Sequence, residues 1–323
     1  MTEAIMYHNY NMNTVAEHIR SDKKKRLILD TDTFNEVDDQ FAIGYAMLSD
    51  NIEILAMTAA PFASPEYPDP ADGMEISFKE LVKVRDMVDP DGKMAIPCYR
   101  GSTCFMENTI TPVHSEAVDN IIRIVHETDD IVYIAAIGAF TNVASALMAD
   151  PSIMDKVVVI MIGANTYNYE GGNCNEYNLK QDRAAARILF ECGVPLVVLP
   201  AEGGTSQLYT TNAELNYYLK DKAGVYGNYL CEIVARYEGE PVLGKTCNSR
   251  ERIIWDIAAI AFLKDVERFS WIDIHPARTI TADGYWRFLD SGAMGREMIY
   301  TDVFDRCEIM SDFYTTVLNS DLK

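Results

Sequence analysis

The sequence predicts an α/β protein, built as a single domain with a mostly parallel, open sheet flanked by helices. Short apolar runs alternate with segments of helical periodicity along most of the chain, which is typical of a parallel sheet covered on both faces. Of the 323 residues, 48% are hydrophobic and 24% are charged, so the chain can bury a sizeable core. Because no repeat, low-complexity tract or Gly/Ser-rich linker divides the chain, we expect one domain.

Strands are predicted where short, mainly apolar runs are bounded by polar or turn-forming residues. The predicted main strands span residues 26–30, 52–60, 132–137, 157–162 and 195–199. Several short strands are expected between residues 271 and 302, with Gly284 and Gly292 at turns. Because the main strands are apolar throughout, we expect both faces of the sheet to be buried.

Helices are predicted where apolar residues recur at helical spacing. The predicted helices span residues 41–48, 74–87, 117–125, 141–149, 183–191, 211–236, 253–263 and 303–318. Thr111-Pro112 supplies a capping residue and a first-turn proline ahead of the helix at 117–125. Four prolines between residues 61 and 70 predict a loop over 61–72.

Residues 1–25 are expected to form a polar extension ahead of the domain at 26–323. The extension has no apolar core of the kind that a signal peptide needs. Nowhere does the chain approach the roughly 18 uninterrupted apolar residues that cross a bilayer. We therefore expect a cytoplasmic protein with no membrane partner.

The charge of the chain also restricts its partners. With 28 Lys+Arg against 49 Asp+Glu the net charge is −21, which repels polyphosphate backbones, so we expect no nucleic-acid partner. The basic run at 23–26 is interpreted as a solvated lead-in to the first strand. Seven scattered cysteines without a CxxC pair argue against a disulfide framework and against a zinc site.

An acidic segment follows the first predicted strand, at the edge of the sheet where ligands bind in open parallel sheets. Residues 30–39 hold four aspartates, one glutamate and no basic residue. Acidic runs are usually solvated, but this one lies between a buried strand and a buried helix. A hard divalent cation would relieve the repulsion, because it takes several carboxylate and carbonyl oxygens. The absence of His and Cys from residues 30–39 favours calcium over zinc, copper or nickel.

Together with three later segments, this acidic segment resembles the inosine-uridine-preferring nucleoside hydrolases. The Asp-x-Asp…Asp-Asp pattern at 30–39 is similar to that family's signature. Residues 137–147 are similar to its G-x-L-T-N-hydrophobic segment, and residues 171–182 to its G-N…E-F-N…D segment. Trp255-Asp256 occupies the place of a late His-Asp pair. The resemblance covers about residues 26–320, and it implies the fold of those enzymes and a homodimer or homotetramer.

The resemblance implies a calcium-dependent hydrolase that splits the N-glycosidic bond of ribonucleosides into free base and ribose, as in purine salvage. It implies that Ca²⁺ is held by the carboxylates of Asp32, Asp39 and Asp256 and by the backbone carbonyl of Thr141. Asp32 would also activate a metal-bound water. The residues implied to hydrogen-bond the ribose are Asp38, Asn173, Glu176 and Asn178, while Asp30 would orient the loop.

The residue types suit this reaction. Cleavage passes through an oxocarbenium-like sugar, whose developing positive charge the surrounding carboxylates stabilise. Asn and Glu side chains suit a neutral sugar with several hydroxyls, whereas a phosphate would favour Lys, Arg or a glycine-rich nest. We therefore expect a nucleoside rather than a nucleotide as the substrate.

The chain also departs from the family pattern at three places. Five residues, 33–37, separate Asp32 from Asp38 where the family usually has three, which could bring Asn35 and Glu36 into the pocket. Ala60-Pro61-Phe62 replaces the usual Gly-Asn, so a ribose-contacting asparagine is missing. Trp255 replaces a histidine that protonates the leaving base in some members, and stacking on it implies a preference for purines.

Two alternatives remain from the residues alone. Asp30-Thr-Asp32 after a strand is similar to the nucleophile motif of haloacid-dehalogenase-type phosphatases, although that motif expects Thr or Val where this chain has Phe34. The chain could also be a sugar- or nucleoside-binding protein that has the same fold without turnover. Release of free base distinguishes the hydrolase from both alternatives, and release of phosphate identifies the phosphatase.

Overall fold

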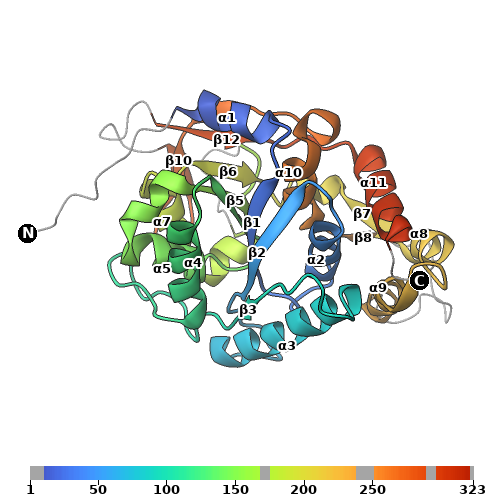
Figure 1. Ribbon diagram of the computed structural model, residues 1–323. Coiled ribbons are helices and arrows are strands. Elements are labelled where there is room, and N and C mark those ends of the chain that lie inside the picture. The colour runs from blue at the N-terminus through green and yellow to red at the C-terminus, as the bar shows by residue number, and fades with distance from the viewer. Residues whose placement is uncertain (1–10, 168–174, 238–250, 289–295, 321–323) are drawn as a thin grey trace, which may run out of the picture.

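A computed structural model describes residues 11–167, 175–237, 251–288 and 296–320 (Figure 1). Its centre is an eight-stranded sheet in the order β3-β2-β1-β4-β5-β6-β12-β9. These strands are β1 (Lys25–Thr31), β2 (Ile52–Ala59), β3 (Cys98–Tyr99), β4 (Val132–Ala136), β5 (Val157–Ile162), β6 (Leu196–Leu199), β9 (Ile274–Pro276) and β12 (Glu297–Tyr300). All neighbours pair in parallel except β12 and β9, which are antiparallel. The prediction of a mostly parallel, open sheet is confirmed.

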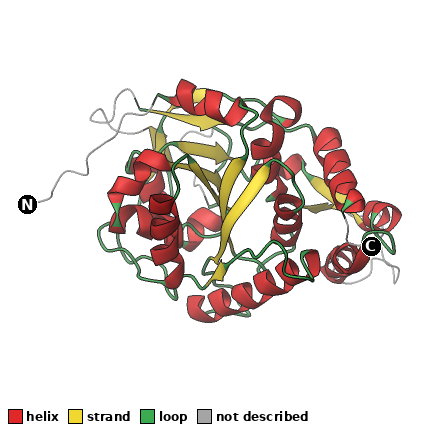
Figure 2. Cartoon of the chain, in the orientation of Figure 1, coloured by secondary structure: helices red, strands yellow, loops and turns green. Residues whose placement is uncertain are grey.

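Helices cover both faces of the sheet (Figure 2). They are α1 (Met12–Arg20), α2 (Asp39–Met47), α3 (Pro70–Val88), α4 (Glu116–Glu127), α5 (Thr141–Ala149), α6 (Tyr177–Gln181), α7 (Arg183–Glu191), α8 (Asn212–Tyr218), α9 (Gly224–Tyr237), α10 (Ile257–Phe269) and α11 (Arg306–Asn319). Two further strand pairs lie outside the main sheet, β7 (Tyr209–Thr211) with β8 (Glu251–Ile253) and β10 (Arg278–Ile280) with β11 (Trp286–Phe288).

The core forms two layers, one on each face of the sheet. Leu27 and Leu29 of β1 pack into a cluster with α1, α2, α3, α10 and α11. Ile28, between them, packs into a second cluster with α4, α5 and α7. Successive side chains of a strand point to opposite faces, so an apolar run such as 27–29 needs both faces covered.

Several helix boundaries differ from the prediction. The helix α4 is capped by Ser115, whose Oγ accepts from the backbone N–H of Val118, so the predicted cap at Thr111 is wrong. Pro70 lies in the predicted loop, but it opens α3 behind the capping carboxylate of Asp69, because a proline fits the first helical turn. The predicted helix at 211–236 is two helices, α8 and α9, since Asp221 between them has a left-handed φ of 58°.

The start of the chain contributes to the domain. Within the predicted extension, α1 buries Met12, Val15, Ala16 and Ile19 in the first core cluster. Lys25 at the start of β1 is 2% exposed, and its ammonium donates to the carbonyls of His18 and Ser21. The helix is therefore joined to the sheet by packing and by hydrogen bonds. Among the described residues, no helix has the length and apolar character needed to cross a membrane.

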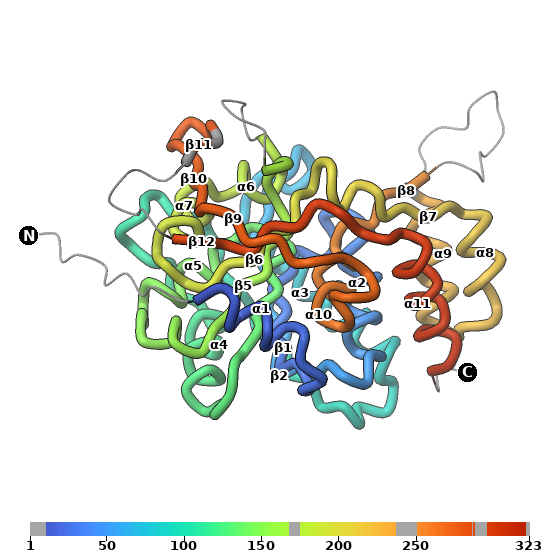
Figure 3. Tube along the Cα trace, turned by 90° about the horizontal axis from the view of Figure 1, so that it is seen from above, coloured from blue at the N-terminus to red at the C-terminus, as the bar shows by residue number. Residues whose placement is uncertain are grey.

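The carboxyl ends of β1, β4, β5 and β6 lie at one edge of the sheet, because these strands are parallel neighbours. The loops that follow them, the short helix α6 and the start of α10 therefore meet there. In the view from above, α6 and the pair β7–β8 lie on the same side of the molecule (Figure 3). This edge positions the candidate site.

Candidate active site

A cavity of about 230 Å³ lies at the carboxyl ends of the strands. Its wall comes from the loop after β1, from the residues after β4 and β6, from α6 and from the start of α10. Seven carboxylates line it: Asp32, Glu36, Asp38, Asp39, Glu176, Glu202 and Asp256. No Lys, Arg or His is among the described residues of this lining. The cavity is therefore strongly negative.

Three of these carboxylates form a compact group. Asp38, Asp39 and Asp256 are buried, and each places an oxygen within 4.8 Å of the other two. Burial raises the pKa of each well above its usual value, and the neighbouring carboxylates raise it further. Buried like charges at this separation cost free energy unless a cation or protons neutralise them. An all-oxygen set of this kind suits a hard divalent cation.

The fold brings this group together through two helix starts. Asp38 directly precedes α2 and Asp39 is its first residue, while Asp256 directly precedes α10. The two helices pack against each other, so their N-terminal ends lie side by side. Helix N-termini carry partial positive charge and favour anions, which offsets part of the repulsion. The hydroxyl of Thr31 donates to Asp39 Oδ1 and fixes that carboxylate.

Asp32 lies in the same cavity, beside the compact group. The amide of Asn35 donates to Asp32 Oδ2 at 3.1 Å. On its other side, a Cβ atom at position 138 would come within 2.8 Å of Asp32 Oδ1, so the carboxylate is seated against a glycine. Burial raises the pKa of Asp32 well above its usual value, and the charges of Asp38 and Glu36 add to the effect. The structure therefore brings together Asp32, Asp38, Asp39 and Asp256.

Glu176 and Asn178 also line the cavity, and the backbone holds both. Glu176 caps α6, where its Oε1 accepts from the N–H of Asn178 and its Oε2 from the N–H of Leu179. Burial nevertheless raises the pKa of Glu176 to about 7. The amide of Asn178 donates to the carbonyls of Ile137 and Ile162, both at 3.1 Å. These side chains are thus preorganised at the ends of β4 and β5.

Two residues singled out in the sequence lie elsewhere, and a third is not described. Thr141 starts α5, its hydroxyl donates to Asp182 at 2.7 Å, and it does not line the cavity. Ile137, four residues earlier, lines it instead. Asp30 is buried behind the cavity and accepts from Thr58 and Asn142, so it stabilises the end of β1. Asn173 lies outside the described residues.

The five-residue spacer adds two polar side chains to the cavity. Asn35 and Glu36 both line it, as the longer loop suggested. Glu36 Oε1 lies 3.5 Å from the guanidinium of Arg252, on the neighbouring strand β8. Glu202 also lines the cavity, and sequence reasoning missed it. Its position just after β6 could have predicted it, because polar residues that follow parallel strands lie together at this edge of the sheet.

Trp255 provides the large aromatic surface of the cavity. Its ring is half-buried, and its Nε1 donates to the carbonyl of Ala201 at 3.2 Å. The indole N–H is therefore engaged with the backbone. The guanidinium carbon of Arg252 lies 5.6 Å from the ring centroid. A flat, fixed indole next to Asp256 could stack against an aromatic ring bound in the cavity.

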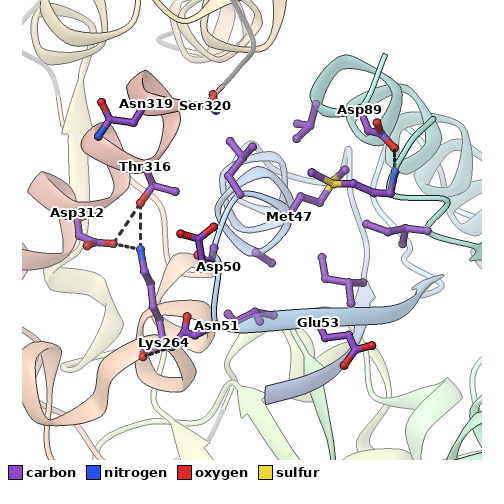
Figure 4. Close-up of a pocket in the computed structure, with 18 of the residues that line it drawn as sticks. Met47, Asp50, Asn51, Glu53, Asp89, Lys264, Asp312, Thr316, Asn319 and Ser320 are labelled. Carbon is purple, nitrogen blue, oxygen red and sulfur yellow. Dashed lines mark hydrogen bonds and ion pairs between the residues drawn. The ribbon is translucent and has the colours of Figure 1, made fainter. Parts of the chain in front are cut away.

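A second and larger hollow lies at the opposite, amino-terminal edge of the sheet (Figure 4). Its volume is about 1100 Å³, and its wall comes from the start of β2 and from the ends of α2, α3, α10 and α11. Several charged side chains of this hollow are paired. Lys264 forms an ion pair with Asp312 and donates to Thr316 at 3.0 Å, and Arg268 also donates to Asp312. This hollow contains no comparable group of unneutralised carboxylates among its described residues.

Comparison with protein families gives one match over most of the chain. Residues 27–299 match the family described as inosine-uridine preferring nucleoside hydrolase. A probable uridine nucleosidase from Oryza sativa is 29% identical over 141 residues, which are 42% of this chain and 41% of that protein. A pyrimidine-specific ribonucleoside hydrolase from Escherichia coli is 27% identical over 198 residues, or 55% of this chain and 59% of that protein. The matched part thus spans less than two thirds of these relatives.

Solved structures of similar fold extend over nearly the whole chain. A plant nucleoside hydrolase superposes with a TM-score of 0.71 at 21% identity, covering 92% of this chain and 99% of that one. A purine-preferring ribonucleoside hydrolase from Gardnerella vaginalis gives a TM-score of 0.70 at 21% identity, with the same coverage. At these identities the likeness concerns the fold.

Proposed function

Because the chain belongs to the inosine-uridine preferring nucleoside hydrolase family, we propose that it hydrolyses the N-glycosidic bond of ribonucleosides with the help of bound Ca²⁺. The observation that carries the proposal is the group of buried carboxylates, without a basic residue in the described lining, at the carboxyl ends of the strands. An enzyme that stabilises a cationic sugar needs such a negative, preorganised cavity. The products are free base and ribose.

The donor atoms fit calcium. Asp39 and Asp256 belong both to the set expected from the sequence and to the compact group, and Asp32 is the third carboxylate of the proposal. For the backbone ligand the proposal keeps the carbonyl of Thr141, because the carbonyl of Ile137, a residue of the cavity lining, already accepts from the amide of Asn178. All these donors are oxygens, as a hard cation prefers. A bound divalent cation lowers the pKa of a coordinated water and orients it for attack.

Asp32 acts as the general base in this proposal. Its carboxylate takes a proton from the attacking water, whose oxygen bonds to C1′ of the ribose while the bond from C1′ to the base nitrogen breaks. The remaining carboxylates stabilise the positive charge that develops on the sugar. Asp38, Glu176 and Asn178 hydrogen-bond the ribose hydroxyls, and Glu176 and Asn178 are held for this by backbone groups.

Trp255 stacks against the departing base. The indole is no acid at neutral pH, and its N–H is already donated to Ala201, so the leaving base takes its proton from solvent. Stacking favours a large aromatic base, and we therefore propose a preference for purine nucleosides. The names of similar proteins mention uridine, pyrimidines and purines in turn, so the base preference rests on Trp255.

The phosphatase alternative fits the structure less well. Asp30, one candidate nucleophile, lies behind the cavity and is hydrogen-bonded to Thr58 and Asn142. The described lining has no Lys or Arg to hold a phosphate. A binding protein without turnover has the same cavity, so only an activity measurement separates it from the hydrolase.

A nucleoside panel tests the proposal directly. Calcium-loaded and chelator-stripped protein is incubated with inosine, adenosine, guanosine, uridine and cytidine, and free base is measured by chromatography. We expect base release by the calcium-loaded protein alone, together with stoichiometric calcium by elemental analysis. Tight nucleoside binding without release would support the binding protein, and release of phosphate from phosphate esters would support the phosphatase.

A further inference from the structure

Two departures of this chain from the family pattern meet in the structure. One is the longer spacer after Asp32, which contains Asn35. The other is Tyr177, which stands where the family segment E-F-N has a phenylalanine. The Tyr177 hydroxyl lies 3.1 Å from Asn35 Oδ1, although 142 residues separate the two along the chain. The hydroxyl that distinguishes tyrosine from phenylalanine is therefore the atom that contacts the inserted residue.

The spacer folds back so that Asn35 reaches Asp32. Phe34 has a left-handed φ of 100°, and the backbone N–H of Asn35 donates to the carbonyl of Asp32 at 3.1 Å. This tight turn places the Asn35 amide against Asp32 Oδ2, again at 3.1 Å. Among the described residues, Asn35 is the side chain recorded as donating to this carboxylate.

The direction of each hydrogen bond in this network follows from the number of protons that each group can donate. The carbonyl of Ala63 accepts from the amide of Gln181 at 2.8 Å and lies 2.9 Å from the Tyr177 hydroxyl. If the hydroxyl proton points to Asn35 Oδ1, the Asn35 N–H faces the carboxylate, and Ala63 still keeps its bond from Gln181. An ionised Asp32 only accepts hydrogen bonds, so the N–H end of the Asn35 amide faces it, and the Tyr177 hydroxyl stabilises this orientation when it donates to Asn35 Oδ1.

We propose that Asn35 is a positioning residue for Asp32 and that the Tyr177 hydroxyl helps to hold the Asn35 amide in this orientation. The inference rests on the proposed function, in which Asp32 takes a proton from water. Asn35 holds one oxygen of Asp32, and the glycine at 138 gives the other oxygen room, so the carboxylate keeps one orientation. In this way the longer spacer supplies an amide next to the site in a chain whose strand β2 is followed by Ala60-Pro61-Phe62.

The test is a double-mutant cycle with Asn35→Ala, Tyr177→Phe and the double variant, assayed on the best nucleoside of the panel. We expect Asn35→Ala to lower kcat about 10- to 100-fold, which corresponds to one hydrogen bond to a charged group. Tyr177→Phe restores the family residue and should lower kcat about 3- to 10-fold. The double variant should match Asn35→Ala, because the hydroxyl acts through the amide. KM and calcium affinity should change less than about twofold in all three.

The controls separate positioning from folding and from the proposed function. Asn120→Ala removes an exposed amide on α4, and its kcat should equal that of the wild type. Independent losses that multiply in the double variant, or a KM increase without a kcat change, would overturn the positioning role. If the wild type and Asn35→Ala release base equally well, the inference is overturned while the proposed function stands. A wild type that releases no base from any nucleoside overturns the proposed function and, with it, the inference.

Discussion

The two hollows at opposite edges of the sheet are both lined by polar residues, but they differ in the signs of the charges that line them. The larger one, at the amino ends of the strands, has about 1100 Å³ and pairs Lys264 and Arg268 with Asp312. The smaller one, at the carboxyl ends, has about 230 Å³ and holds seven carboxylates with no basic residue in its described lining. Volume alone would select the wrong edge of the molecule.

The two hollows differ in how far the charge of their carboxylates is compensated by neighbouring groups. In the large hollow, Asp312 accepts from Tyr45, Lys264 and Arg268, so its charge is compensated. In the small cavity, the pKa values of Asp32, Asp38, Asp39 and Asp256 are all raised, so the metal-free fold is electrostatically strained there. Clustered carboxyl groups with raised pKa values in a cavity are typical of a functional site.

The largest expected effect is on kcat, and it should distinguish a substitution at Asp32 from one at Asp312. Asp32→Asn should lower kcat about 10²- to 10⁴-fold, because it removes the general base. Asp312→Asn, in the other hollow, should leave kcat within about twofold. Calcium content is measured in both variants, since Asp32 is also a proposed ligand. Near-normal turnover in calcium-replete Asp32→Asn would remove Asp32 from that role.

Calcium should stabilise the protein through the small cavity. At a free concentration about 100 times Kd, ligand binding adds about 2.7 kcal/mol to the free energy of unfolding. We expect thermal unfolding to shift to higher temperature with calcium, and Asp39→Asn to reduce the shift. An equal shift in Asp39→Asn would place the ion elsewhere, for instance in the large hollow.

The large hollow should contribute to stability alone. Asp312→Ala leaves Lys264 and the Tyr45 hydroxyl without their shared acceptor in a site where Lys264 is 18% exposed. We expect a loss of about 2–3 kcal/mol in the free energy of unfolding, measured with urea. The matched control is Asp91→Ala, which breaks the exposed pair with Lys93 and should leave the free energy of unfolding nearly unchanged.

Trp255 should affect the choice of base within the small cavity. Trp255→Ala is expected to lower kcat/KM for inosine and guanosine about 10-fold, since stacking on an aromatic ring contributes about 1–3 kcal/mol per base. A p-nitrophenyl riboside, whose leaving group needs no proton, should lose less. Equal losses on every substrate would mean that Trp255 only supports the fold.

The metal-free protein should become less stable as the pH rises. A carboxyl whose folded-state pKa lies above its unfolded value binds its proton more tightly in the fold, so its contribution to stability is present below the unfolded pKa. That contribution is lost as the pH rises through the folded pKa. Burial raises the pKa of Asp30 to about 6 and that of Glu176 to about 7, so the loss should extend from about pH 4 to about pH 7. Unfolding curves with chelator should show this decline, and excess calcium should reduce it; a flat chelator profile would contradict it.

Much of the fold follows from local patterns. The strands at 26–30, 132–137 and 157–162 and the helices at 141–149 and 183–191 lie where the sequence predicts them, because each is a strongly periodic run with clear ends. Where a predicted helix boundary was wrong, the conformation or the hydrogen bond of a single residue decided the boundary. Asp221 breaks the predicted helix at 211–236, and Ser115 rather than Thr111 caps α4.

By itself, the sequence determined the alternation of strands and helices, the edge of the sheet where the site lies and the acidic character of that site. These follow from hydrophobic period and from the rule that parallel strands end at one edge. The tertiary structure alone decided that Ile137 lines the cavity and that Asn35 meets Tyr177 across 142 residues. Such contacts depend on strand register and helix packing over long sequence separations, and no local pattern of residues encodes those distances.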